Sequence, residues 1–180
     1  MLVERNEEIC MSTEMEMDDI YQDDTLDAGT ARKYLLFHLG DEEYGVDIHH
    51  VQSIEELQKI TVVPDLSKAM KGVINLRGQV IPVMDLRLRF GLSARDYDDR
   101  NCIIILSLSD ITLGIIVDTV SEVKDIPDDQ IESASSFGDL GSRERFVQGL
   151  GKVEQEVKIL LDVTRILADE DRASLTDTME

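Results

Sequence analysis

Two pairs of side chains in this sequence have the types from which a metal site or an acid–base pair could be built. His49 and His50 are adjacent, but neighbouring side chains usually point apart, so a metal ion would need further ligands from elsewhere. Asp85 and Asp118 could form a carboxylate pair, although nothing in the sequence places them together. We therefore expect solvated or capping roles for the histidines and solvated aspartates.

Motifs of catalysis and cofactor binding are absent from the sequence. It contains no G-x-S-x-G elbow, P-loop, C-x-x-C pair or G-x-G-x-x-G sequence. Gly149-Leu150-Gly151 lacks the third glycine and the helix of a dinucleotide site. A phosphoacceptor aspartate would need a doubly wound receiver domain, which the strand-rich pattern disfavours. We expect no catalytic, cofactor or metal site, and hence no enzyme.

Arg77 is the charged residue of greatest interest, because it lies between two short apolar runs. Val73 to Leu76 and Val80 to Val83 are β-prone, so Arg77-Gly78-Gln79 is expected to form the turn of a hairpin. Pro82 removes one backbone donor, which sheets tolerate at edges or bulges. The pattern predicts a hairpin at the rim of a small barrel, accessible to another protein.

The whole chain predicts an all-β fold with short helices. Many short strands at close spacing indicate barrels rather than alternating βαβ units. The expected hairpins are 34–39 with 44–46, 73–76 with 80–83, 102–108 with 111–117, and 146–153 with 157–161. Further strands are expected at 60–63, after 51, and at 120–126 continuing the 102–117 hairpin. Short helices are expected at 48–51, 86–90 and 162–167, a helical turn at 66–70, and a surface loop at 127–141.

Several segments match one family pattern in the same order. They are Gly40 to Ile48, Gly72-Val73-Ile74-Asn75-Leu76-Arg77-Gly78, Ile81-Pro82-Val83, Asp85-Leu86-Arg87, Gly114 to Asp118 with Val120 and Val123, and Gly149 to Gly151. Together they span residues 33 to 167 and closely resemble the CheW-like coupling proteins of bacterial chemotaxis. The resemblance implies two intertwined small SH3-like β-barrel subdomains. It also implies a noncatalytic adaptor between the cytoplasmic tip of chemoreceptors and the regulatory domain of the histidine kinase CheA.

The resemblance also implies a set of partner-binding residues. By their positions in the family pattern these are Arg77, Gly72, Asn75, Ile48, Val51, Ser53, Glu55, Leu113 and Gly114. For each there is a competing structural interpretation. Arg77 could be solvated or pair with a carboxylate, the glycines could serve turns and tight corners, and the apolar residues could be core.

The chain departs from the family pattern at Ser53, where relatives usually carry a glutamate that can pair with the arginine matching Arg77. Glu55 or Glu56 could replace it. On an extended strand Glu55 shares a face with Ser53, whereas Glu56 points the other way. Glu55 is therefore the expected partner of Arg77.

Charge is concentrated at the two ends of this 180-residue chain, whose formal net charge is −20. Residues 1–32 contain ten acidic residues against Arg5 and Arg32, and residues 168–180 contain five against Arg172. We expect a disordered acidic tail at 1–30, a CheW-like domain at 31–167 and a second acidic tail at 168–180. No basic stripe is present for nucleic acid or for an anionic membrane.

Cysteine usage and hydropathy favour a cytoplasmic protein. Cys10 lies in the acidic segment and Cys102 opens an apolar run, so a disulfide framework is not expected. The first ten residues do not form a signal peptide, and the longest apolar run is too short to span a bilayer. Any recruitment to membrane-associated receptor arrays would then occur through partners, without direct insertion.

Two alternative functions remain open from the sequence. A β-barrel subunit that senses a small molecule would need an apolar pocket with convergent polar groups. The same adaptor role could also serve a chemosensory pathway with an output other than motility.

Overall fold

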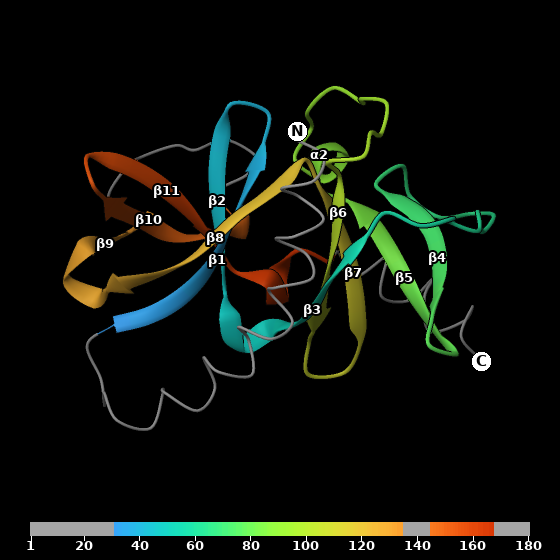
Figure 1. Ribbon diagram of the computed structural model, residues 1–180, viewed down its shortest axis with the longest axis horizontal. Helices are drawn as coiled ribbons and strands as arrows, with labels where there is room; N and C mark the ends of the chain where they lie inside the picture. Colours follow the sequence, from blue (N-terminus) through green and yellow to red (C-terminus); the bar gives the residue numbers. More distant parts are fainter. Residues whose placement is uncertain (1–30, 135–144, 168–180) are drawn as a thin grey trace.

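The computed structural model describes residues 31–134 and 145–167. Within these ranges the chain forms two sheets, which lie side by side in Figure 1. The first sheet contains β1 (Ala31–Leu39), β2 (Glu42–Asp47), β8 (Thr119–Pro127), β9 (Ile131–Ser133), β10 (Val147–Val153) and β11 (Glu156–Leu161). The second sheet contains β3 (Val51–Glu56), β4 (Met70–Leu76), β5 (Gln79–Asp85), β6 (Cys102–Ser107) and β7 (Thr112–Val117). The predicted all-β fold of two small SH3-like barrels with short helices is confirmed.

The two sheets are intertwined because all strands of the second sheet lie, in sequence, between strands β2 and β8 of the first sheet. The first sheet has the order β8-β1-β2-β11-β10-β9, and the second has the order β3-β6-β7-β5-β4. After β2 the chain builds all of the second sheet, then crosses at Asp118 into β8, which pairs antiparallel with β1. Later, β11 pairs parallel with β2. Residues distant in sequence therefore meet in the first sheet.

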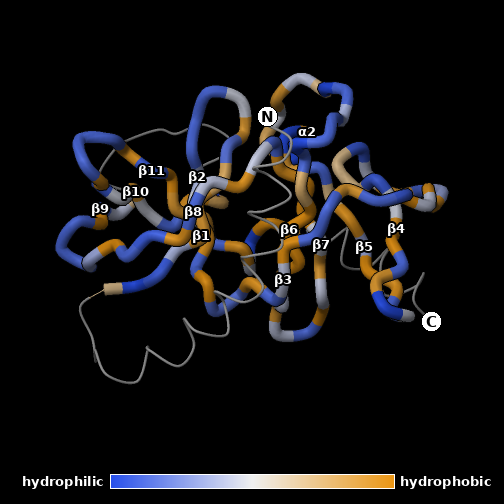
Figure 2. The backbone as a smooth tube through the Cα atoms, in the orientation of Figure 1, coloured by the Kyte–Doolittle hydropathy of each residue, from blue (hydrophilic) through white to orange (hydrophobic). Residues whose placement is uncertain are grey.

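Strand β1 shows why the strands have continuous apolar sequences instead of alternating apolar and polar residues. Tyr34 and Leu36 point into an apolar cluster that belongs to the first sheet alone. Leu35 and Phe37, on the opposite face, point into a larger cluster shared by the two sheets. Because both faces of the strand are buried, hydrophobic residues are required at successive positions rather than at alternate ones. Figure 2 shows this apolar concentration where the two sheets meet.

Strand β6 is buried in the same two-sided way. Ile103 and Ile105 point into a cluster of the second sheet's own, whereas Ile104 and Leu106 join the shared cluster. Such branched side chains fit the pleated surface of a strand. The described residues thus form three apolar cores: one inside each barrel and one between them.

The described helices are short: η1 (Ile48–His50), α2 (Leu86–Arg89), η2 (Asp128–Gln130) and η5 (Val163–Arg165). Helix α2 begins after Asp85, whose carboxylate accepts hydrogen bonds from the backbone N–H groups of Arg87 and Leu88. It stops before Gly91, whose φ of +75° ends the helix as the sequence predicts. The helices expected at 48–51 and 162–167 are present as shorter 3-10 turns.

Three local expectations need correction. Strand β8 does not continue the β6–β7 hairpin, because it crosses to pair with β1. The segment 60–63 is not a strand, since Thr61 makes only an isolated bridge to Val73. The predicted loop at 127–141 contains η2 and the three-residue β9 in its described part, and 135–141 lies outside the described residues. The single turn expected at 66–70 is present, and in it Met70 N–H donates to Ser67 C=O.

The position of Pro82 also differs from expectation. The β4–β5 hairpin does lie at the end of the second sheet, but β4 is the edge strand and Pro82 is in β5, the inner arm. The pairing of β5 with β7 begins only at Val83. Pro82 therefore has just one paired strand beside it, which is why its missing N–H group is tolerated.

The acidic segments expected at 1–30 and 168–180 lie outside the described residues. Within the described ranges, no helix is long and apolar enough to cross a membrane.

Candidate partner-binding site

The candidate site begins at the tip of the β4–β5 hairpin. Leu76 pairs with Gln79, so the turn consists of two residues, Arg77 and Gly78, one fewer than the sequence suggested. Their φ angles are +54° and +85°, the combination found in type I′ turns that match the twist of the flanking strands. The Asn75 side chain supports the turn, because its Oδ1 accepts a hydrogen bond from Gly78 N–H at 3.0 Å.

Arg77 occupies a backbone conformation that does not suit it. The left-handed region costs a residue with a Cβ about 1–2 kcal/mol, and Asn, Asp or Gly normally fill this turn position. The Arg77 side chain is 72% exposed, so burial of its own surface contributes little in return. Strain of this kind at an accessible residue is a basis for inferring function.

Glu55 is the carboxylate that the structure places beside Arg77. Its Oε1 lies 4.0 Å from Arg77 Nη2, and its side chain is only 18% exposed. Among the described residues that same oxygen is buried and accepts no hydrogen bond. The pair is thus an ion pair at its outer limit, and the carboxylate retains acceptor capacity.

Strand β3 presents Glu55 on the same face as Ser53. Their register partners on β6 are Ile103 and Ile105, the two residues that point into the second sheet's own core. Ser53 is buried, whereas Glu56, on the other face, is exposed. The geometry agrees with the expectation that Glu55 rather than Glu56 faces Arg77.

Gly72 is required by the path of the chain. A Cβ at this position would lie 2.0 Å from the carbonyl oxygen of Thr61, because the segment before β4 crosses it there. Thr61 and Val73 exchange backbone hydrogen bonds at this crossing. With a φ of +143°, Gly72 also has a backbone conformation that other residues rarely adopt.

The remaining predicted site residues are buried in the free chain. Ile48, Val51 and Leu113 all belong to the core shared by the two sheets. Val51 and Leu113 flank Leu106 from the two strands on either side of β6. Gly114 faces the second sheet's core, where an added Cβ would lie 2.9 Å from Ile103 Cγ2. The structure thus gives these four residues packing roles and places them apart from the hairpin tip.

One exposed apolar residue beside the tip was missed in the sequence. Val80, directly opposite Asn75, is largely exposed although it lies in an apolar arm. Its neighbour Ile81 is buried. Strand alternation gave no signal, because Pro82 and Met84 on the same face of β5 are buried. Val80 lies in the part of β5 that extends beyond its pairing with β7, which begins at Val83.

The other residues considered for chemistry are engaged in separate local contacts. Asp85 Oδ2 accepts a hydrogen bond from the Tyr97 hydroxyl at 2.7 Å. Burial raises the pKa of Tyr97 above its ordinary value near 10, and this hydrogen bond raises it further. Asp118 pairs with Arg87, and Asp47 accepts from His49. Over the described residues, no group of His, Cys, Asp and Glu could hold a metal ion.

Two interlocked small β-barrels with a charged hairpin tip define a recognisable class of all-β domain. The family model described as "CheW-like domain" matches residues 33–171. Chemotaxis protein CheW of Klebsiella aerogenes is 36% identical over 142 residues, which cover 79% of this chain and 85% of that protein. Chemotaxis protein CheW of Bacillus subtilis is 35% identical over 150 residues, covering 83% of this chain and 96% of that protein.

A solved structure shows the same likeness. The scaffolding protein TtCheW from Thermoanaerobacter tengcongensis matches with a TM-score of 0.67 and 34% sequence identity, over 73% of this chain and 88% of that one. The chain therefore belongs to the CheW-like domain family.

Proposed function

We propose that this protein is a noncatalytic adaptor of a bacterial chemosensory pathway. Its relatives in Klebsiella aerogenes and Bacillus subtilis are named chemotaxis proteins, and the matching solved structure is described as a scaffolding protein. The observation that carries the proposal is family membership over residues 33–171, combined with an exposed, strained arginine at an accessible hairpin tip. The domain boundaries proposed from the sequence, 31–167 between two acidic tails, are part of this proposal.

The proposed partners are the regulatory domain of the histidine kinase CheA and the cytoplasmic tip of a chemoreceptor. The adaptor would be cytoplasmic and recruited to receptor arrays through these contacts. Receptor and kinase, held in a fixed arrangement, would transmit a ligand-driven shift in the receptor by favouring one arrangement over the other. Micromolar affinity, about −8 kcal/mol, is sufficient for such reversible coupling.

Arg77 is the proposed anchor for the receptor. Arginine is enriched among the residues that dominate interface energies, and its planar fork recognises carboxylates and carbonyl groups. Val80 would add an apolar contact next to it. Glu55, with Ser53 beside it in place of the family's usual glutamate, would orient the guanidinium and accept a donor from the partner. Asn75 and Gly72 would act through the backbone of the hairpin.

Calorimetric titration tests the proposal. The full chain is titrated with the regulatory domain of a chemotaxis kinase from the same cell, with and without a receptor signalling fragment. Saturable binding to both at separable sites is expected. Absence of binding to every such kinase would overturn the proposal, and binding to a kinase of a non-motility pathway would keep the adaptor role with a different output.

A further inference from the structure

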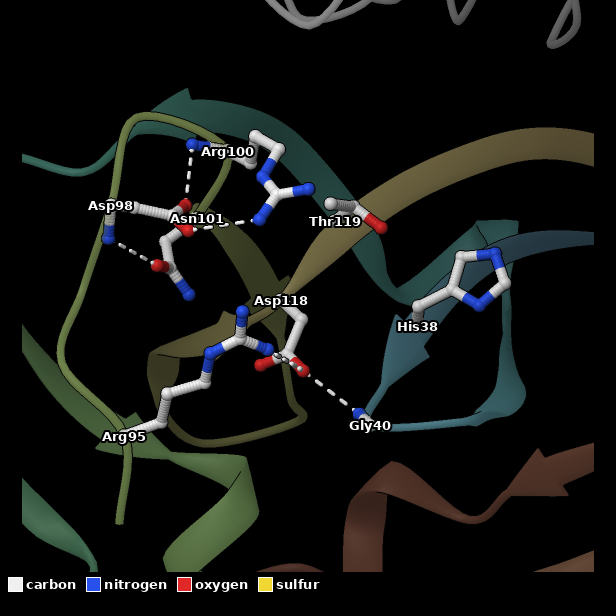
Figure 3. Close-up of a pocket in the computed structure, with 8 residues that line it drawn as sticks. All are labelled: His38, Gly40, Arg95, Asp98, Arg100, Asn101, Asp118 and Thr119. Atoms are coloured by element: carbon white, nitrogen blue, oxygen red, sulfur yellow. Dashed lines mark hydrogen bonds and ion pairs between the residues drawn. The ribbon is translucent and has the colours of Figure 1, made fainter. Parts of the chain in front are cut away.

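A polar pocket lies where the chain crosses from the second sheet to the first. Its volume is about 190 Å³, compared with the 10–15 Å³ or so that a single water requires. His38, Gly40, Asp118 and Thr119 line it from the first-sheet side and the crossing. The loop between α2 and β6 supplies the rest, including Arg95 and Arg100 (Figure 3).

Each of the two carboxylates of the pocket already accepts hydrogen bonds from an arginine. Asp118 Oδ2 accepts hydrogen bonds from Gly40 N–H at 2.8 Å and from Arg87 Nη1 at 2.7 Å. Asp98 accepts from the backbone N–H of Arg100 at 2.8 Å and from its Nη2 at 3.2 Å. These bonds fix the walls and compensate both negative charges.

Hydrogen-bond donors in the pocket exceed acceptors. Arg95 Nη1 is 3.8 Å from Asp118 Oδ2, too far for a hydrogen bond, and its guanidinium donates none to any described residue. Arg100 uses only Nη2 of its side chain, and the Thr119 hydroxyl makes no hydrogen bond to the described part of the chain. In Figure 3 the guanidinium of Arg100 extends toward Thr119. A pocket with spare cationic donors is complementary to a ligand that has only acceptors.

We propose that this pocket binds a small oxyanion of the phosphate or sulfate class. The anion would lie between Arg95 and Arg100, with Thr119 as a third donor. Three arginines, Arg87, Arg95 and Arg100, pair with the two carboxylates of the pocket, Asp98 and Asp118. Asp96 and Asp99 of the same loop do not line the pocket. Arginine forks match the geometry of phosphate and sulfate oxygens.

The pocket is separate from the proposed partner site. None of the predicted partner-binding residues lines it, although Glu55, the register partner of Ile103, lies near the same end of β6. Because its walls come from both sheets, a bound anion would hold the two barrels together. The proposed anion site is independent of the adaptor role, so its failure would leave the adaptor proposal standing.

The test is an NMR titration of the full chain with sodium phosphate at pH 7, with sodium chloride adjusted to keep ionic strength constant. The amide of Gly40, which bonds to the pocket wall, and the side-chain Nε groups of Arg95 and Arg100 are followed. Saturable shifts confined to these groups and their neighbours are expected. Shifts that rise linearly without saturation, or none up to 50-fold excess, would overturn the proposal.

Matched variants identify the donors. Arg95→Gln and Arg100→Gln are each expected to weaken phosphate binding about tenfold or more. Arg32→Gln is the control, because its side chain is 53% exposed, as is that of Arg95, and it is also loosely paired, at 3.6 Å from Asp128, outside the pocket. Equal weakening in all three variants would show general screening and overturn the assignment.

Discussion

Gly72 and Gly78 lie six residues apart in one hairpin and have different structural requirements. Both have positive φ angles, +143° and +85°. At Gly72 the carbonyl of Thr61 occupies the space that a side chain would need, whereas nothing lies within 4 Å of a Cβ added at Gly78. One glycine is required by a close approach of two backbone segments and the other only by its turn.

We expect Gly72→Ala to lower the free energy of unfolding by about 3 kcal/mol or more, because either β4 or the crossing segment must move. Gly78→Ala should cost about 1 kcal/mol, the ordinary penalty for a left-handed alanine. Urea unfolding of both variants measures the difference. Equal losses would mean that the crossing adjusts freely, and that any binding defect of Gly72→Ala reflects recognition rather than folding.

Tyr97 makes stability depend on pH in the alkaline range. Its pKa is raised in the folded chain by burial and by the bond to Asp85, whereas in the unfolded chain it titrates near 10. Below pH 10 both states keep the proton. Above pH 10 the unfolded state loses it first, so the free energy of unfolding falls as pH rises.

We expect Tyr97→Phe to show a shallower fall in stability between pH 9.5 and 11.5 than the parent chain. At pH 7 the variant should be less stable by about 1 kcal/mol, since Asp85 loses a hydrogen-bond donor. The free energy of unfolding of the variant should still fall somewhat at alkaline pH, because burial also raises the pKa of Tyr34. Urea titrations across this range provide the measurement, and an unchanged slope would contradict the assignment.

At the scale of elements, local pattern was enough to find most strands. The 102–108 and 111–117 arms were clear because β-branched residues fill both of them, and the helix stop at Gly91 follows from its freedom to adopt positive φ. Strand β9 was not predicted, because its three residues are too few to show a hydrophobic period and their neighbours have the composition of turns. The crossing of β8 to the first sheet depends on contacts distant in sequence, which local pattern does not contain.

The candidate site was predictable to the same degree. The motif around Arg77 located the hairpin, and strand alternation selected Glu55 over Glu56. Burial of Ile48, Val51 and Leu113 in the shared core was not predictable in detail, since it requires knowing which face of each strand meets the other sheet. The close crossing at Gly72 likewise arises only in three dimensions.

The type I′ turn allows folding and recognition to be separated. We expect Arg77→Asn to keep or raise stability, by up to about 1 kcal/mol, because asparagine suits the first position of this turn. Binding of the receptor fragment should weaken about tenfold or more, as expected for loss of an anchoring arginine. Thermal unfolding and calorimetry on the same sample report the two effects.

Arg165→Asn is the control for that experiment, because Arg165 is an exposed arginine outside the hairpin. It should leave receptor binding unchanged. A destabilised Arg77→Asn variant would show that Arg77 holds the hairpin in place, and unchanged binding would remove it from the partner site.

At the scale of the whole molecule, the shared core couples the two barrels. Ile104 points into the shared core and Ile103 into the second barrel alone, yet both lie on β6. We expect either isoleucine-to-alanine change to cost about 3 kcal/mol. Amide hydrogen exchange should show the slowest amides of β1 and β6 losing protection by equal amounts in both variants. Loss confined to β6 in Ile103→Ala would show that the barrels unfold separately.

Insertion of the second sheet within the first sets the order in which a nascent chain can fold. Strands β1 and β2 leave the ribosome first, but their partner β8 ends at Pro127, 80 residues after Asp47. At roughly 5–20 residues per second, the ribosome completes β8 about 4–16 s after it has completed the β1–β2 hairpin. During this interval both apolar faces of β1 lack the strand β8 that completes their barrel, so we expect the partly synthesised chain to be most prone to aggregation at this stage.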